Sequence, residues 1–261
     1  MKQKKEKKAD TDTIFVQIAS YRDPQLIPTI DNMLANASNP NNLTICICWQ
    51  HCDDDKWDNL DKYKKDKRFK IIDIDYLQSK GVCWARNQVQ QLYNKEKYTL
   101  QLDSHHRFMK NWDKELISMI NNLKKKGYKK PLLTAYIPSF DPDNDPADRV
   151  NEPWKMNFDR FIPEGAVFFL PASFDIWDDK TQPLPARFYS AHFCFTLGRF
   201  AKEVQHDPEY YFHGEEISIA VRAYTHGYDL FHPHKVICWH EYTRKGRSKQ
   251  WDDDKDWAKK K

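Results

Sequence analysis

Glycine is scarce in this chain, with seven among 261 residues, and no apolar run approaches the length of a membrane-spanning helix. The first twelve residues are charged and lack the apolar segment of a secretion signal. Few glycines together with 14% aromatic residues exclude long flexible linkers and argue against a disordered protein. We therefore expect one packed domain that is cytoplasmic and has no membrane contact.

Cysteine is also used sparingly, and its six positions form neither a paired CxxC nor a regular disulfide framework. Most of them fall in apolar, strand-like runs. We interpret all six as buried thiols.

The formal net charge is only +4, and much of it lies at the two ends of the chain. This pattern predicts a disordered basic tail over residues 1–12, a folded domain over 13–248 and a charged C-terminal tail over 249–261. The remaining sequence has no basic stripe interleaved with aromatic residues, so no nucleic-acid partner is expected.

Apolar strands alternate with helical patterns along most of the chain, which predicts an α/β fold with one open, mixed, mostly parallel sheet flanked by helices. Between 139 and 187 the regularity fails: proline and aspartate abound, and GAVFFLP is the one clear strand. Long irregular segments inside a domain are often functional, so we expect a binding loop there. The expected strands are 13–20, 43–50, 69–76, 98–102, 131–138 and 188–198; the expected helices follow Pro24 and cover 82–95, 111–125 and 213–227.

The strand YTLQL ends abruptly at Asp103, Ser104, His105 and His106. In open α/β sheets ligands bind at the carboxyl ends of the strands. On an extended segment Asp103 and His105 point the same way, while Ser104 faces elsewhere, so the two together can hold a cation such as Mn²⁺. The alternative is that these polar residues simply end a strand. Other acidic pairs, such as Asp73 with Asp75, lack a nearby third ligand.

Several phrases in this order resemble the GT-A (Rossmann-like) nucleotide-sugar glycosyltransferases: IASYRDPQLIPTI, ARN, LDSHHRF and HGEEISIA. LDSH looks like their DXD motif, and the segment YFHGEEISIAVRAYTHGYDL resembles their WGGEN segment and its helix. The phrases are most similar to the cytosolic polypeptide N-acetylglucosaminyltransferases that modify hydroxyproline or Ser/Thr. This resemblance spans roughly residues 13–244.

The resemblance implies a UDP-sugar donor, with UDP-GlcNAc favoured, and Mn²⁺ or Mg²⁺ as the cofactor. It implies His240 as a third metal ligand beside Asp103 and His105. Asp103 and Glu215 are the implied catalytic residues. The residues implied to bind the donor are Ser20, Tyr21, Arg22, Arg86, Asp103, Glu215 and Glu216. Arg244, Lys245 and Arg247 are candidates to fold over the diphosphate.

Ordinary structural roles remain open for each of these residues. His240 can be a hydrogen-bonded histidine at a strand end, Arg86 a surface arginine, and Glu215 with Glu216 a helix-dipole pair. Glu216 stands where the family has asparagine and His213 where it has glycine, so the sugar pocket can differ from the family's.

The resulting hypothesis is metal-dependent transfer of a sugar, with retention, to a hydroxyl on a polypeptide or glycan acceptor. If configuration is retained, the leaving phosphate can take the acceptor's proton, and no dedicated base is needed. One alternative is a non-catalytic module that keeps the fold and binds a nucleotide or a protein. Another is an iron oxygenase using His51 and Asp53, but its usual all-β fold conflicts with the strand–helix alternation.

Overall fold

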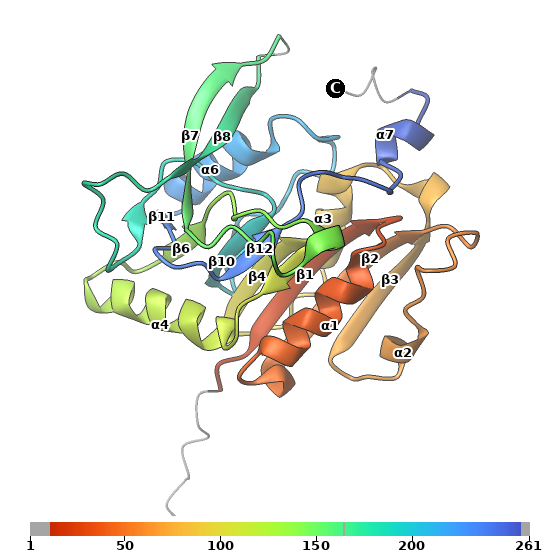
Figure 1. Cartoon of the computed structure of the whole chain (residues 1–261), viewed down its shortest axis with the longest axis horizontal. Helices are drawn as coiled ribbons and strands as arrows, with labels where there is room; N and C mark the ends of the chain where they lie inside the picture. The colour runs from red at the N-terminus through yellow and green to blue at the C-terminus, as the bar shows by residue number, and fades with distance from the viewer. Residues whose placement is uncertain (1–10, 164, 257–261) are drawn as a thin grey trace, which may run out of the picture.

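The computed structural model describes residues 11–163 and 165–256 and is built around one mixed sheet of eight strands (Figure 1). The strand order is β3-β2-β1-β4-β10-β6-β11-β9. Neighbours among the first four strands are parallel, β6 and β11 are parallel, and β10 and β9 run antiparallel to their neighbours. The sheet strands are β1 (Ile14–Tyr21), β2 (Leu43–His51), β3 (Phe69–Asp75), β4 (Tyr98–Asp103), β6 (Pro131–Thr134), β9 (Leu184–Pro185), β10 (Phe193–Leu197) and β11 (Asp229–His232).

The central strands are buried on both faces because successive side chains alternate across the sheet. In β1, Ile14, Val16 and Ile18 join one core cluster, whereas Phe15 joins another on the opposite face. Because helices pack on both faces of the sheet, β1 needs apolar side chains on both faces, and its sequence is therefore almost continuously apolar.

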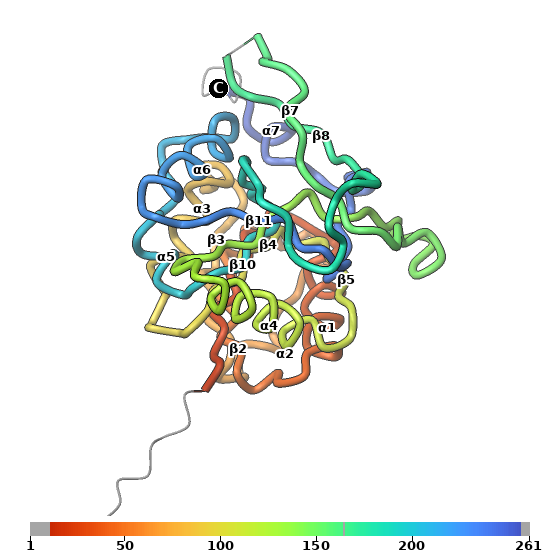
Figure 2. Tube along the Cα trace, turned by 90° about the vertical axis from the view of Figure 1, so that its left-hand side faces the viewer, coloured from red at the N-terminus to blue at the C-terminus, as the bar shows by residue number. Residues whose placement is uncertain are grey.

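Helices cover both faces of the sheet, as Figure 2 shows with α3, α5 and α6 on one side and α1 on the other. The amphipathic helices α1 and α4 pack on the face that carries Ile14. Helix α3 packs on the face that carries Phe15, and α5 and α6 extend that layer over β6, β10 and β11. The helices are α1 (Leu26–Asn36), α2 (Asp61–Lys64), α3 (Val82–Gln90), α4 (Trp112–Lys125), α5 (Phe200–Glu203), α6 (Glu215–Thr225) and α7 (Gln250–Asp253), with short 3₁₀ turns at Pro40–Asn42, Tyr76–Gln78 and Pro142–Asn144.

Two small sheets complete the fold. Strands β5 (His106–Phe108) and β12 (Cys238–His240) pair antiparallel and join distant parts of the chain. Strands β7 (Trp154–Phe161) and β8 (Val167–Ser173) form a hairpin that extends away from the main sheet (Figure 1).

The predicted α/β fold with a mixed, mostly parallel sheet is confirmed. Four local predictions need correction. The predicted helix 82–95 ends at Gln90. Segment 139–187 contains β7 and the short β9 as well as the expected strand. Strand β7 escaped notice because most of its side chains are exposed and its apolar residues do not alternate. The predicted strand 131–138 ends at Thr134, and the predicted strand 188–198 starts only at Phe193.

Five of the six cysteines are buried thiols as predicted, but Cys52 is only partly buried because it lies just after β2, in a loop. Residues 1–10 of the predicted N-terminal tail and residues 257–261 of the predicted C-terminal tail lie outside the described residues. Residues 249–256 of the predicted C-terminal tail are described and include α7. Among the described residues, no helix has the length and apolarity to cross a membrane.

Candidate metal and nucleotide site

The end of β4 and the end of β12 bring three predicted ligands together. Asp103 is the last residue of β4, His105 follows it, and β12 aligns His240 with His106 of β5. Backbone hydrogen bonds fix this junction: the His240 N–H donates to the Pro138 carbonyl at 2.9 Å, and the Glu241 N–H donates to the His105 carbonyl at 3.1 Å. A residue near the C-terminus is thus held beside the first half of the chain.

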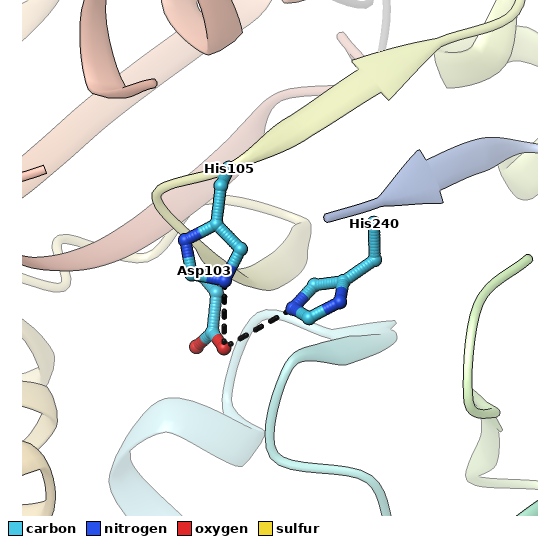
Figure 3. Close-up of side chains that lie close together, drawn as sticks. All are labelled: Asp103, His105 and His240. Carbon is cyan, nitrogen blue, oxygen red and sulfur yellow. Dashed lines mark hydrogen bonds and ion pairs between the residues drawn. The ribbon is translucent and has the colours of Figure 1, made fainter. Parts of the chain in front are cut away.

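The side chains of Asp103, His105 and His240 point toward one another (Figure 3). Asp103 Oδ2 lies 3.7 Å from His105 Nε2 and 3.5 Å from His240 Nε2. One ligand atom from each residue lies within 4.8 Å of the others, and this is the one such group of three or more among residues 11–163 and 165–256. Because metal–ligand bonds of about 2.1 Å place two ligands up to about 4.2 Å apart, a small contraction suffices to hold a divalent ion.

Asp103 and His240 have the protonation states that metal binding requires. Burial opposes ionisation of Asp103, but the Arg86 guanidinium and the His240 ring hold the pKa of this carboxyl well below its usual range. Burial, together with the neighbouring His192, lowers the pKa of His240 well below its usual value. The carboxylate is therefore charged and the His240 ring neutral at physiological pH.

Arg86, on α3, lies beneath this group and joins the two predicted catalytic acids. Its Nη2 donates to Asp103 Oδ1 at 2.5 Å, and its Nη1 donates to both oxygens of Glu215 at 2.7 Å. His206 Nδ1 also lies 2.6 Å from Glu215 Oε1. Although burial opposes ionisation of Glu215, Arg86 and His206 lower its pKa to about 2. Arg86 and Glu215 are only 4% and 5% exposed, so they form a buried ion pair that orients Asp103.

Glu216, also predicted to bind the donor, faces a different set of groups. Its carboxylate accepts hydrogen bonds from the Ala191 N–H at 2.9 Å and from the Tyr136 hydroxyl at 3.1 Å. Burial, aided by the adjacent Glu215, raises the pKa of Glu216 to about 7. The two neighbouring acids at the start of α6 thus have very different proton affinities.

The predicted nucleotide residues at the end of β1 are engaged by other parts of the chain. Ser20 is buried. The Tyr21 hydroxyl donates to Asp253 Oδ2 at 2.7 Å. Arg22 pairs with Asp55 at 2.7 Å and with Asp253 at 3.0 Å. The partners Asp55 and Asp253 come from a loop and from α7, and no motif in the sequence identified them.

A cavity of about 140 Å³ lies between the ends of β1 and β4 and the chain after β12. We call residues 244–253 the C-terminal strap, because its residues line this cavity opposite Tyr21, Asp103 and His105. The strap contacts the body through the rings of Trp251 and Phe212, which meet edge to face with centroids 5.7 Å apart. The cavity is smaller than the about 300–1,000 Å³ of pockets for drug-sized ligands, and the strap forms one of its walls.

Other polar pairs singled out in the sequence do not gather at this site. His51 Nε2 pairs with Asp73 at 2.8 Å, and Asp75 caps the turn after β3 by accepting from the Leu77 N–H. Lys245 pairs with Asp141 at 3.4 Å rather than facing the cavity. Arg244 and Arg247 do line the cavity.

Comparisons with known proteins agree with this geometry. A family model described as "Glycosyltransferase (GlcNAc)" matches residues 13–69 and 58–261. The crystal structure of GalNAc-T7 with UDP, GalNAc and Mn²⁺ is similar with a TM-score of 0.68 and 16% identity, over 93% of this chain and 46% of that chain. S. aureus TarS 1–349 is similar with a TM-score of 0.56 and 13% identity, over 88% of this chain and 60% of that chain.

The same TarS fragment in complex with UDP gives a TM-score of 0.56 at 12% identity, over 89% of this chain and 61% of that chain. The chain thus spans roughly half of the length of these solved structures. A comparison with curated protein sequences found no significant match. At these identities the structural likeness establishes the GT-A fold.

Proposed function

Because the chain belongs to the GlcNAc glycosyltransferase family, we propose that it transfers GlcNAc from UDP-GlcNAc to a hydroxyl group, with Mn²⁺ or Mg²⁺ bound by Asp103, His105 and His240. The observation that carries the proposal is the meeting of these three side chains from distant parts of the chain. When bound, the ion neutralises the charge that develops on a departing diphosphate. The similar GalNAc-T7 structure contains UDP and Mn²⁺, which supports this combination.

In this proposal the buried residues hold the ligand carboxylate in place for catalysis. Asp103 and Glu215 form the catalytic pair, and Arg86 links them through hydrogen bonds to both. Such preorganisation matters because a ligand that is already oriented needs no rearrangement during the reaction. Glu215 and Glu216 begin α6 beside the site, and we assign them to the donor-sugar side.

The nucleotide part of the donor is assigned to the end of β1. Ser20, Tyr21 and Arg22 lie at the carboxyl edge of the sheet, where ligands of open α/β folds bind. Arg22 also lies over the Tyr76 ring, with 4.6 Å from its guanidinium carbon to the ring centroid. An arginine–aromatic pair of this kind offers a flat surface for a base, and binding there requires Asp253 to leave.

For the acceptor we propose a hydroxyl on a polypeptide, with retention of the anomeric configuration. Support comes from the family and from the segment between Phe140 and Phe161, which begins beside the site because the Phe140 N–H donates to the His240 carbonyl at 3.2 Å. In a retaining reaction the leaving phosphate oxygen takes the acceptor's proton, so no separate base is needed. Six unpaired cysteines support a reducing, cytoplasmic location.

The test is a screen of UDP-sugars for hydrolysis and transfer by the full chain, with and without Mn²⁺. We expect UDP-GlcNAc to be consumed, EDTA to abolish turnover, re-added Mn²⁺ to restore it, and Asp103→Ala to match the chelated enzyme. The control is Asp113→Asn, which alters a buried carboxylate that accepts from the N–H groups of Ser38 and Asn39.

Turnover that persists after metal removal, or in Asp103→Ala, contradicts the metal-dependent mechanism. Turnover of another UDP-sugar in preference to UDP-GlcNAc contradicts the donor assignment. NMR of the first-formed product reads its anomeric configuration, and an inverted product contradicts retention.

A further inference from the structure

We propose that Asp23 is a positioning residue that fixes the ring of His105 so that its Nε2 faces the metal. The proposal rests on the metal site proposed above. It assigns Asp23 to the metal ligand rather than to the nucleotide, although Asp23 lies directly after Tyr21 and Arg22 in the sequence.

Asp23 is held rigidly in the interior between β1 and α1. It is 3% exposed, and its Oδ1 accepts from the Gln25 N–H at 2.8 Å. Its Oδ2 accepts from the Ser104 hydroxyl at 2.7 Å and lies 2.7 Å from His105 Nδ1. The spacing of the sequence predicts that the Ser104 side chain points away from the ion. Its hydroxyl instead holds the Asp23 carboxylate in place.

The contacts of Asp23 determine which nitrogen of His105 carries the proton. A carboxylate buried among donors is an acceptor only, so the nitrogen facing it, Nδ1, must carry the hydrogen. Arg247 contacts both partners: its Nη1 donates to Asp23 Oδ2 at 2.7 Å and also lies against His105 Nδ1, and its Nη2 lies 3.3 Å from His105 Nε2. Since the guanidinium faces both ring nitrogens, the assignment depends on Asp23. The lone pair of Nε2 is thus directed away from Asp23 and toward the side of Asp103 Oδ2.

Asp23 has the donors that a buried carboxylate needs, because the Gln25 N–H, the Ser104 hydroxyl and Arg247 Nη1 all donate to it. A carboxylate that accepts the far N–H of a metal-bound imidazole orients the ring and raises its basicity, and losing that partner typically weakens metal binding by about 10–100-fold. His105 is the one imidazole ligand of this site with such a partner, because no hydrogen bond is found for His240 Nδ1 among the described residues.

The first experiment measures the tautomer of His105 in the metal-free full chain by long-range ¹H–¹⁵N NMR, with the signal assigned from its absence in His105→Gln. We expect an Nδ1–H ring with unprotonated Nε2 in the unmodified chain and loss of this preference in Asp23→Asn. An Nε2–H tautomer in the unmodified chain overturns the proposal without any need for a variant.

The second experiment titrates Mn²⁺ and follows the free ion by EPR. We expect Asp23→Asn to weaken binding by about 10–100-fold and the matched control Asp113→Asn to leave it unchanged. Equal Mn²⁺ affinity of a folded Asp23→Asn and the unmodified chain overturns the role of Asp23. If the unmodified chain fails to bind Mn²⁺, the metal site itself is wrong, and the NMR result still decides whether Asp23 orients His105.

Discussion

At the scale of single residues, the site is distinguished by charges that are buried but individually matched. Arg86 is held between Glu215 and Asp103, and Asp23 is held between His105 and Arg247. Burying an unmatched charge costs several kcal/mol, so each of these groups depends on its partner for the stability of the fold as well as for the site. Replacing Arg86 measures this dependence.

Arg86→Met should destabilise the protein by about 3–5 kcal/mol, because it leaves the buried Glu215 and Asp103 carboxylates without their common partner. Urea unfolding followed by circular dichroism gives the change in free energy. Arg68→Met is the matched control, since it removes an ion pair with Asp66 that is more exposed and worth less than about 1 kcal/mol. Similar losses in the two variants would show that Arg86 has no special role.

Glu216→Gln should stabilise the protein at pH 8 but not at pH 4.5. The pKa of Glu216 is raised to about 7, so the folded state keeps a proton that the unfolded chain has lost above its ordinary pKa of 4.5. The stability that this neutral form provides is complete below pH 4.5 and is lost as the pH rises to about 7, by up to about 3 kcal/mol. Because glutamine is neutral at every pH, the Glu216→Gln variant keeps this stability as the pH rises.

Thermal unfolding of both proteins from pH 4.5 to pH 8.5 gives the measurement. The groups that face Glu216 are the Ala191 N–H, the Tyr136 hydroxyl, Glu215 and Arg86. Of these, Glu215 keeps its charge across this range because its pKa is about 2. A difference between the two proteins that does not vary with pH would contradict the elevated pKa.

At the scale of elements, the strap over residues 244–253 lies against the residues proposed to bind the nucleotide. It lines the cavity of about 140 Å³, and its last residue, Asp253, accepts hydrogen bonds from both Tyr21 and Arg22. When a site is open only part of the time, the apparent affinity for a ligand falls by the open fraction. If the nucleotide binds as proposed, we therefore expect the contacts of the strap with the body to lower its apparent affinity.

Asp253→Asn should strengthen UDP binding by about tenfold, because the charge-assisted bonds that close the strap on Arg22 are lost. Isothermal titration with UDP and Mn²⁺ measures the affinity. Asp252→Asn is the control, since Asp252 contacts Lys249 within the strap rather than the body. Weaker binding in Asp253→Asn alone would mean that Asp253 supports the occupied state.

The elements also show how far sequence reasoning extends. The core strands and α4 were predictable because β-branched runs and 3.6-residue periodicity follow directly from burial. Strand β7 was missed because its partner is another exposed strand, which leaves no alternating pattern in the sequence. The contact by which Asp253 holds the strap against the body could not be predicted either. Asp253 lies in a run of three acidic residues that has the composition of a solvated tail.

At the scale of the whole molecule, His240 could be predicted as the third member of the proposed metal site only through family resemblance, since Asp103 and His240 are 137 residues apart along the chain. Nothing local to His240 marks it as a ligand. It reaches the site through the pairing of β12 with β5, which is a property of the tertiary structure. The role of Arg86 was also beyond local reasoning, because both of its partners come from other elements.

The reactivity of the six cysteine thiols measures whether the whole fold is intact. Burial raises the pKa of Cys46 and Cys48 to about 12, and Cys83, Cys194 and Cys238 are likewise buried with raised pKa values. Because the thiolate is the reactive form, Cys52 alone should react quickly with DTNB in the native protein, whereas all six should react in guanidinium. Fast reaction of a second thiol in the native state would show that one of the cores is open.

The pairing of β12 with β5 has a consequence for synthesis of the protein on the ribosome. A nascent chain lacks the third proposed ligand, His240, until β12 has emerged, although Asp103 and His105 were made more than a hundred residues earlier. Translation that stops before β12 thus yields a polypeptide in which the proposed ion site is incomplete.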